Sequence, residues 1–252
     1  ESRSPAVTKS GALYYPLWLI YAAAYVQKNG HEVYFLDAPA KPLNEDETLA
    51  LLTDKADDHT LFVLDTSTPS IKSDVNFAEH IKQIYPHAYL VLVGTHPSAC
   101  AEETLGYSKA VDAVAIGEYD ETIKELANAI ENRRELMQVR GLCLRREETF
   151  IRTGIMPSIK NLDDIPFASA FIKDNLNERD YFFAAATYPS IQIFTGRGCP
   201  FHCNFCVYPQ TMHGHIFRAR SAENVVDEFE YIAENFPDVK EVVIEDDTFT
   251  VN

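Results

Sequence analysis

The sequence predicts an α/β protein, with a doubly wound, Rossmann-like domain followed by the first strand–loop–helix–strand unit of a second domain. Two observations carry this prediction. Short uninterrupted apolar strands alternate with amphipathic helices, which is typical of a parallel sheet covered on both faces. Several of these strands end in short polar segments, as expected where the carboxyl ends of parallel strands form a ligand-binding edge.

The composition indicates a folded, acidic protein. Its 252 residues include 22 Lys and Arg against 38 Asp and Glu, a formal net charge of −16, and 46% are hydrophobic. This apolar share can build a core, and the acidity disfavours non-specific nucleic-acid binding, which needs a basic surface. The longest apolar run, 17–26, is about half of the roughly 20 residues that span a bilayer, and no secretory leader opens the chain. We expect a soluble, cytoplasmic protein with no membrane span and no nucleic-acid partner.

Residues 1–136 form the predicted doubly wound domain. Apolar runs predict strands at 31–36, 61–64, 89–93 and 112–116. Helical spacing predicts helices at 17–29, at 74–85 and from the predicted cap Asp120 onward. The polar segments 65–69, 94–97 and 117–118 follow three of the strands, so they lie at one edge of the predicted sheet.

Two further regions follow this domain. In residues 137–189 the sequence predicts a hairpin at 139–153, followed by an ordered linker. Residues 190–252 predict a strand at 191–195, a helix capped by Ser221 and a strand at 242–244. A barrel needs more strands than these two, so we expect a chain truncated at its C-terminus; the strand that usually opens a parallel domain is also missing.

Three of the five cysteines lie in one segment with C-x3-C-x2-C spacing: Cys199, Cys203 and Cys206. Clustered thiolates directly after a strand indicate a metal site in a reducing compartment rather than a disulfide framework. Three such thiolates can hold three irons of a [4Fe-4S] cluster and leave the fourth iron open. The alternative is structural zinc, whose fourth ligand would be a nearby histidine: His202, His213 or His215.

The cysteine segment resembles the signature of the radical S-adenosylmethionine (radical SAM) enzymes, C-x3-C-x-aromatic-C, with Phe205 at the aromatic position. The resemblance implies a βα partial barrel, a [4Fe-4S] cluster and reductive cleavage of S-adenosylmethionine to a 5′-deoxyadenosyl radical. It implies that Phe205 packs near the adenine. It also places Glu245 and Asp246, at the end of the second strand, near the methionine amino group; the alternative is that they are solvated or cap a helix. Arg197 is placed near the cofactor carboxylate, or in a surface ion pair.

The first domain resembles that of the cobalamin-binding subgroup of this family. The resemblance rests on Gly94-Thr-His-Pro97 and Gly117-Glu118 at strand ends and on the segments at 218–228 and 246–249. It implies bound cobalamin, with hydrogen bonds to the corrin tail from four residues: Ser67, Thr68, Gly94 and Thr95. The alternative for Gly94 is that it only permits the turn. The Asp-x-His-x-x-Gly motif, whose histidine ligates cobalt in other cobalamin domains, is absent, so neither His31 nor His96 is assigned to cobalt.

The resemblance as a whole implies a cobalamin-dependent radical SAM enzyme that transfers a methyl group to an unactivated carbon of a small-molecule substrate. Its reductant would be a protein such as flavodoxin or ferredoxin. Radical cyclisation or rearrangement is the alternative reaction within the family. A non-catalytic corrinoid- or zinc-binding module is the alternative from another class.

Overall fold

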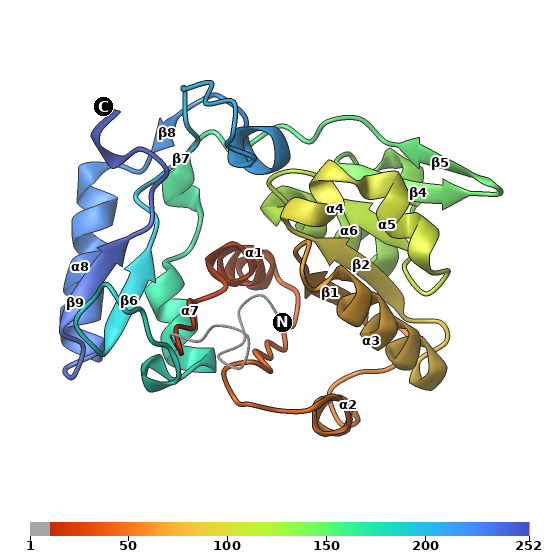
Figure 1. Cartoon of the computed structure of the whole chain (residues 1–252), viewed down its shortest axis with the longest axis horizontal. Coiled ribbons are helices and arrows are strands. Elements are labelled where there is room, and N and C mark those ends of the chain that lie inside the picture. Colours follow the sequence, from red (N-terminus) through yellow and green to blue (C-terminus); the bar gives the residue numbers. More distant parts are fainter. Residues whose placement is uncertain (1–10, 252) are drawn as a thin grey trace. The chain divides into compact units, whose positions relative to one another are not determined.

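A computed structural model of the chain describes residues 11–251, which divide into two compact units. The first unit contains Leu43–Ser158 and Phe205–Met212, and the second contains the described residues 11–42, 159–204 and 213–251. Figure 1 shows the helices and strands of both units. The boundaries at 136 and 189 that the sequence suggests for the domains stay predictions.

The first unit is built on a five-stranded sheet in the order β1-β2-β3-β4-β5. The strands are β1 (Leu61–Asp65), β2 (Tyr89–Val93), β3 (Ala113–Ala115), β4 (Leu142–Arg146) and β5 (Thr149–Arg152). β1, β2 and β3 pair in parallel, whereas β4 is antiparallel to both β3 and β5. The predicted parallel sheet is confirmed, and the predicted hairpin at 139–153 extends it by two strands.

Helices flank this sheet (Figure 1). They are α3 (Ile71–Ile84), α4 (Thr95–Ala99), α5 (Ala101–Tyr107) and α6 (Asp120–Glu131), with a 3₁₀ turn at Leu136–Gln138. Helix α2 (Glu45–Leu52) lies farther from the sheet and contacts α3 through Glu45 and His80. α3 buries Ile71, Val75, Ala78 and Ile81, the three- and four-residue spacing of one helix face. Tyr119 holds the N-cap position of α6, so Asp120 is its first helical residue and not the predicted cap.

The second unit contains two small sheets and three α-helices among its described residues. β6 (Ser190–Ile193) pairs in parallel with β9 (Glu241–Ile244), and β7 (Gly196–Arg197) pairs antiparallel with β8 (Arg218–Ala219). The helices are α1 (Leu17–Lys28), α7 (Ala168–Asn175) and α8 (Ala222–Asn235), with 3₁₀ turns at Leu162–Asp164, Glu178–Asp180 and Phe249–Val251. A π-helical turn, Pro209–His213, lies at the boundary between the units. The predicted strand–loop–helix–strand unit is confirmed, and the Ser221 hydroxyl caps α8 by accepting from the N–H of Asn224 at 3.1 Å.

The core of the second unit draws on both ends of the chain. α1 packs with α7 and β6 in one hydrophobic cluster, to which Ile20, Phe171, Ile191 and Ile232 contribute fully or almost fully buried side chains. Burying such aliphatic and aromatic side chains is the main stabilising contribution to a fold of this kind. Helix α1, predicted as a helix of the first domain, therefore belongs to the second core.

The predicted strand at 31–36 is wrong, because this segment is neither helix nor strand. Its alternating apolar residues Val33 and Phe35 pack against the hydrophobic cluster of the second unit, where the ring centroids of Phe35 and Phe171 lie 5.3 Å apart. No described strand pairs with the segment. The alternation of apolar and polar residues in this segment reflects side-chain packing, and the backbone lacks the hydrogen bonds to a neighbouring strand that a β-strand requires.

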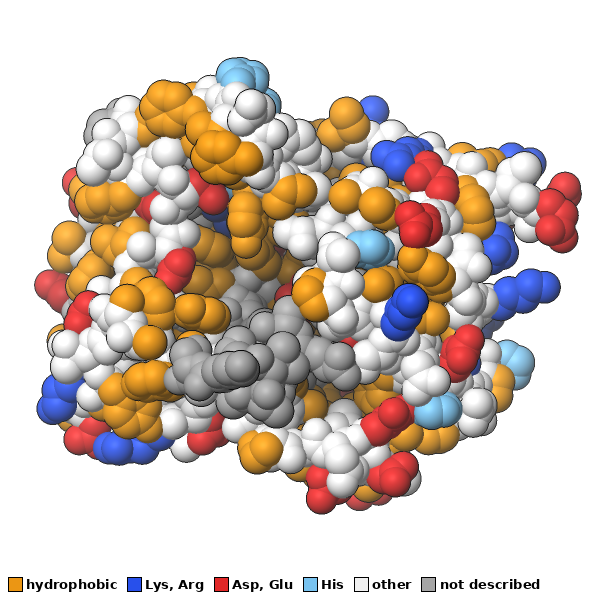
Figure 2. Space-filling model, viewed as in Figure 1, with side chains coloured by type: hydrophobic (Ala, Val, Ile, Leu, Met, Phe, Trp, Pro, Cys, Tyr) orange, Lys and Arg blue, Asp and Glu red, His pale blue; other side chains and the backbone are white. Residues whose placement is uncertain are grey.

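The helices and the surface charges both bear on what the protein binds. None of the helices within residues 11–251 is long and apolar enough to cross a membrane. On the face seen in Figure 2, Lys and Arg side chains lie apart or beside acidic ones and form no continuous basic patch.

Candidate cofactor-binding site

The cysteine segment follows β6 and the short strand β7, as the sequence predicts. β7 ends at Arg197, and Gly198 leads into Cys199. Gly198 has a φ of +96°, and a Cβ atom there would lie 2.1 Å from the carbonyl oxygen of Ile216. Both the backbone conformation and the close approach require glycine. Gly198 therefore sets the path by which the chain enters the cysteine segment.

The three cysteines are free thiols on a segment without regular secondary structure. Cys203 is exposed, and Cys199 and Cys206 are partly exposed. Among residues 11–251, no three His, Cys, Asp or Glu side chains lie close enough together to hold a metal ion. The structure thus does not bring the thiols into a ligand set, but three accessible soft donors on one short segment fit the chemistry of an iron–sulfur cluster.

Phe205, the aromatic residue of the cysteine segment, exposes 88% of its surface. A large apolar side chain so exposed gains nothing from burial in this conformation. Its ring is therefore accessible to a planar ligand.

The two predicted carboxylates at the end of β9 both bind β6 or the turn that follows it. Asp246 accepts hydrogen bonds from the N–H groups of Thr195, at 2.7 Å, and Gly196, at 3.0 Å, and from the Thr195 hydroxyl. Glu245 accepts a hydrogen bond from the side-chain amide of Gln192 at 2.6 Å. These carboxylates therefore join the ends of the two parallel strands just before the cysteine segment.

Arg197 is buried, with 3% of its surface exposed. Its guanidinium lies over the rings of Trp18 and Tyr21 on α1, 4.6 and 5.2 Å from their centroids. Such cation–π contacts stabilise a buried arginine against aromatic faces. In this arrangement the guanidinium packs on aromatic side chains of its own unit.

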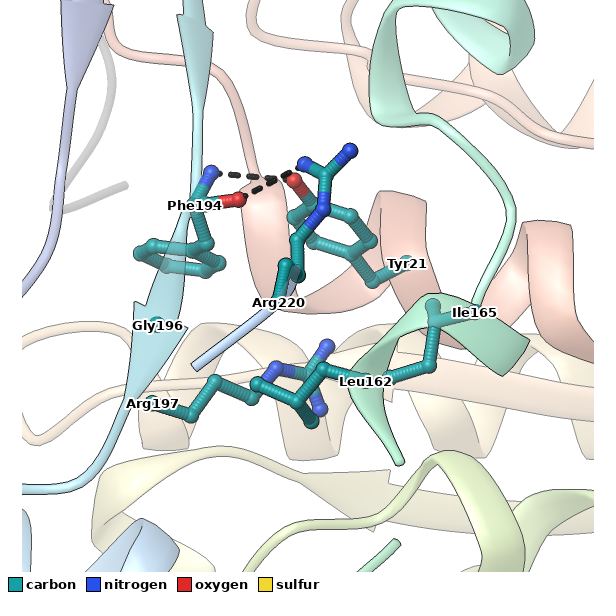
Figure 3. Close-up of a pocket in the computed structure, with 7 residues that line it drawn as sticks. All are labelled: Tyr21, Leu162, Ile165, Phe194, Gly196, Arg197 and Arg220. Carbon is teal, nitrogen blue, oxygen red and sulfur yellow. Dashed lines mark hydrogen bonds between the residues drawn. The ribbon is translucent and has the colours of Figure 1, made fainter. Parts of the chain in front are cut away.

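Figure 3 shows a small cavity in the second unit beside Arg197, lined by seven residues: Tyr21, Leu162, Ile165, Phe194, Gly196, Arg197 and Arg220. The N–H of Phe194 donates to the Tyr21 hydroxyl oxygen at 2.9 Å. Burial raises the pKa of Tyr21 above its usual range, so this hydroxyl stays protonated. The cavity is far too small for a cofactor.

Arg220 and Glu228 form a buried ion pair that the sequence does not predict. Arg220 also donates to the carbonyl oxygen of Phe194 at 2.9 Å, at the end of β6. Glu228 is fully buried and accepts from the N–H and the hydroxyl of Ser169 on α7, at 3.1 and 2.8 Å. Arg220 precedes α8 and Glu228 lies within it, and the spacing of the two residues alone does not predict that they form an ion pair. The network connects α7, α8 and the end of β6.

The predicted edge of the first sheet is also formed. β1 and β2 end side by side, with Asp65 in register with Val93, so the segments that begin at Thr66 and Gly94 are neighbours. The N–H of Thr66 donates to the carbonyl oxygen of Val93 at 2.9 Å. The Ser67 hydroxyl lies 3.2 Å from that of Ser70.

Gly94 lies where the two strand ends come closest. Its φ is +111°, and a Cβ atom there would lie 2.4 Å from the carbonyl oxygen of Thr66 and 2.6 Å from the Asp65 carboxylate. Glycine is needed for this contact whether or not a ligand binds. Thr95, which follows it, begins α4 and is partly buried.

Known proteins resemble this chain in sequence. Residues 3–127 match the B12 binding domain family. An uncharacterized methyltransferase of Pyrococcus horikoshii is 30% identical over 237 residues, which are 94% of this chain and 50% of that protein. The anaerobic magnesium-protoporphyrin IX monomethyl ester cyclase of Cereibacter sphaeroides is 27% identical over 241 residues, covering 94% of this chain and 38% of that one. The chain thus spans half or less of the length of these relatives.

Solved structures share the fold. The radical SAM methyltransferase TsrM from Kitasatospora setae superposes with a TM-score of 0.69 at 16% identity, over 94% of this chain and 46% of that one. The cobalamin-dependent radical SAM enzyme OxsB gives a TM-score of 0.73 at 15% identity, over 92% of this chain and 31% of that one. Residues 3–127 therefore carry a B12 binding domain, and the chain shares the fold of these two radical SAM enzymes.

Proposed function

We propose that the chain provides the cobalamin-binding and cluster-binding parts of a radical SAM enzyme that transfers a methyl group to an unactivated carbon of a small molecule. One observation carries the proposal: three free thiols with C-x3-C-x2-C spacing follow β6 on an accessible segment, in a chain that also contains a B12 binding domain. Methyltransferases among the related proteins support this reaction.

In this proposal the predicted residues of the second unit and of the cysteine segment have the following roles. The thiolates of Cys199, Cys203 and Cys206 hold the [4Fe-4S] cluster, and the exposed ring of Phe205 packs against the adenine of S-adenosylmethionine. Asp246 fixes the turn that carries the cysteine segment, through its hydrogen bonds to Thr195 and Gly196. Once bound, S-adenosylmethionine and cobalamin supply radical generation and a transferable methyl group, chemistry that no amino-acid side chain provides.

The cobalamin would lie at the carboxyl edge of β1 and β2. Ser67, Thr68 and Thr95 offer hydroxyl groups there, and the close approach of backbone at Gly94 keeps this edge compact. Ligands of open parallel sheets bind at this edge. Arg197 would support the cysteine segment through α1 rather than bind the cofactor carboxylate, since its guanidinium is buried on aromatic rings.

The working conditions follow from the chemistry of the cluster. A reduced [4Fe-4S] cluster needs a low-potential electron donor, which we take to be a flavodoxin or ferredoxin, and an anaerobic cytoplasm that keeps the thiols reduced. We propose no nucleic-acid partner, in keeping with the net charge of −16.

Radical cyclisation is the second candidate reaction. It is favoured by the similarity to the magnesium-protoporphyrin ester cyclase of Cereibacter sphaeroides, which extends over 94% of this chain at 27% identity. Mass spectrometry of product formed from methyl-labelled S-adenosylmethionine separates the two reactions, because only methyl transfer adds the labelled carbon to the product.

The experiment that tests the proposal is anaerobic reconstitution of the full chain with iron and sulfide, followed by analysis of bound iron, sulfide and zinc. We expect iron and sulfide in equal amounts, at about four of each per chain, in the wild type and in the control C100A. C203A should lose most of both. A chain that takes up zinc alone would contradict the enzyme and support a corrinoid- or zinc-binding module.

A further inference from the structure

The imidazole of His96 occupies an unusual position in the first unit. His96 is the second residue of α4, just beyond the end of β2, and only 9% of its surface is exposed. Its Nδ1 atom lies 3.1 Å from the hydroxyl of Thr68, which follows β1. The ring therefore connects the two strand ends that form the proposed cobalamin edge.

The second ring nitrogen of His96 is buried without a hydrogen-bond partner. No polar atom of the described residues 11–251 forms a hydrogen bond with Nε2. A buried polar atom normally has a partner, because leaving it unpaired costs the hydrogen bond that it makes with water in the unfolded chain. An orphaned atom at a ligand-binding edge indicates that the ligand supplies its partner.

The contact with Thr68 allows Nε2 to act as a donor. The Thr68 hydroxyl lies within hydrogen-bond distance of Nδ1 of His96, and a hydroxyl can donate to that atom or accept from it. When the hydroxyl donates, the proton of the neutral imidazole resides on Nε2, which becomes a donor. In that tautomer Nε2 binds an oxygen that accepts hydrogen bonds.

We propose that His96 is a cobalamin-positioning residue whose Nε2–H donates a hydrogen bond to an acceptor oxygen of the bound corrinoid, with the Thr68 hydroxyl donating to Nδ1. The inference rests on the proposed binding of cobalamin at this edge. The acceptor oxygen belongs either to an amide side chain of the corrin ring or to the phosphate–ribose tail. His96 does not ligate cobalt in this arrangement, because its free nitrogen carries the proton.

The experiment measures the equilibrium affinity of the full chain for hydroxocobalamin and for cobinamide, which lacks the nucleotide tail. H96A should bind cobalamin about tenfold more weakly than the wild type, the effect of one lost hydrogen bond. H96Q keeps an N–H donor on a side chain of similar reach, so we expect it to recover affinity to within about threefold. T68V, which removes the hydroxyl that can donate to Nδ1, should weaken binding by about threefold.

Two controls keep the result interpretable. H87A removes an exposed histidine of the same unit and should bind as the wild type does. Circular dichroism melts identify any variant that fails to fold, and the loss of affinity expected of T68V still tests the proposal if H96A does not fold. Loss of affinity for cobalamin alone places the acceptor in the tail, whereas equal loss for cobinamide places it on the corrin ring; both support the proposal.

Other outcomes overturn it. If H96A, H96Q and T68V bind cobalamin and cobinamide as tightly as the wild type does, His96 plays no part in binding, while the proposed function stands. If reduced cobalt(II) cobinamide bound to the wild type shows nitrogen hyperfine splitting that disappears in H96Q, His96 ligates cobalt and the hydrogen-bond assignment is wrong. A wild type that binds neither corrinoid removes the cobalamin part of the proposed function itself.

Discussion

Thr195 and Asp246 are joined by two hydrogen bonds across 51 positions of sequence: the Thr195 N–H donates to Oδ1 of Asp246 at 2.7 Å, and its hydroxyl donates to Oδ2. Thr195 follows β6, and Asp246 follows β9. The contact fastens the ends of the two parallel strands immediately before the cysteine segment. A carboxylate that binds backbone N–H groups in this way fixes a turn more firmly than a neutral acceptor does.

Replacement of Asp246 should therefore destabilise this turn. D246A leaves the N–H groups of Thr195 and Gly196 without their acceptor, and we expect a loss of about 2–3 kcal/mol in the free energy of unfolding. The measurement is urea denaturation followed by circular dichroism. D227A, which removes an exposed carboxylate of α8, serves as control and should change stability by less than about 0.5 kcal/mol. Equal stability of D246A and D227A would refute the anchoring role.

The glycine before the first cysteine gives a second prediction. G198A places a Cβ atom 2.1 Å from a carbonyl oxygen in a positive-φ conformation and should cost about 3 kcal/mol or more. Gly214 also has a positive φ, +67°, but nothing lies within 4 Å of its Cβ position, so G214A should cost only about 1 kcal/mol. Thermal melts of the two variants provide the comparison. Similar melting temperatures would contradict the close approach seen at Gly198.

The buried ion pair predicts a strong asymmetry between single and double substitutions. E228A leaves the buried guanidinium of Arg220 without a carboxylate partner and should cost about 3–5 kcal/mol. The double variant R220M/E228L removes both charges and should recover part of that loss. Chemical denaturation of both variants tests this. A double variant less stable than E228A would show that the other hydrogen bonds of Arg220, such as that to Phe194, outweigh the pair.

An exposed ion pair in the first unit predicts a pH dependence. Glu102 on α5 accepts two hydrogen bonds of 2.7 Å from the Arg152 guanidinium on β5, which lowers the pKa of the carboxyl from 4.5 to about 2. A lowered folded-state pKa adds stability above pH 4.5, and this stability is lost as the pH falls from there towards 2. Because both side chains are about half exposed, we expect less than about 1 kcal/mol.

The matched comparison for this pair is E102Q against the wild type. The difference in unfolding free energy between the two should be largest at neutral pH and should shrink as the pH falls from 4.5 to 2. A difference that stays constant over this range would show that the pair contributes through packing and not through charge.

The local sequence pattern predicted those strands correctly that pair with a neighbouring strand in the structure. β2 matches its predicted range because Tyr89–Val93 is an uninterrupted apolar run, and the centre of a parallel sheet buries both faces of such a strand. The strand predicted at 31–36 failed because Val33 and Phe35 show alternation without a pairing strand. Whether a strand finds a neighbour depends on the tertiary fold, which local spacing does not contain.

In the candidate site, too, features within one short segment could be predicted, whereas contacts between distant segments could not. The spacing of Cys199, Cys203 and Cys206 identifies a metal-binding chemistry because all three residues lie within one short segment. The Asp246–Thr195 contact and the orphaned nitrogen of His96 depend on strands meeting across long stretches of chain. Only the folded structure can reveal them, and in it Asp246 binds Thr195 and Gly196 just before the cysteine segment.

The most direct test of the account is electron paramagnetic resonance of the reconstituted, reduced full chain, with and without S-adenosylmethionine. We predict a cluster signal that changes on addition of S-adenosylmethionine, persists in C100A and is absent from C203A. A signal that is the same with and without S-adenosylmethionine would contradict binding to the open iron, and the absence of any cluster signal in the wild type would contradict the radical SAM assignment of the cysteine segment.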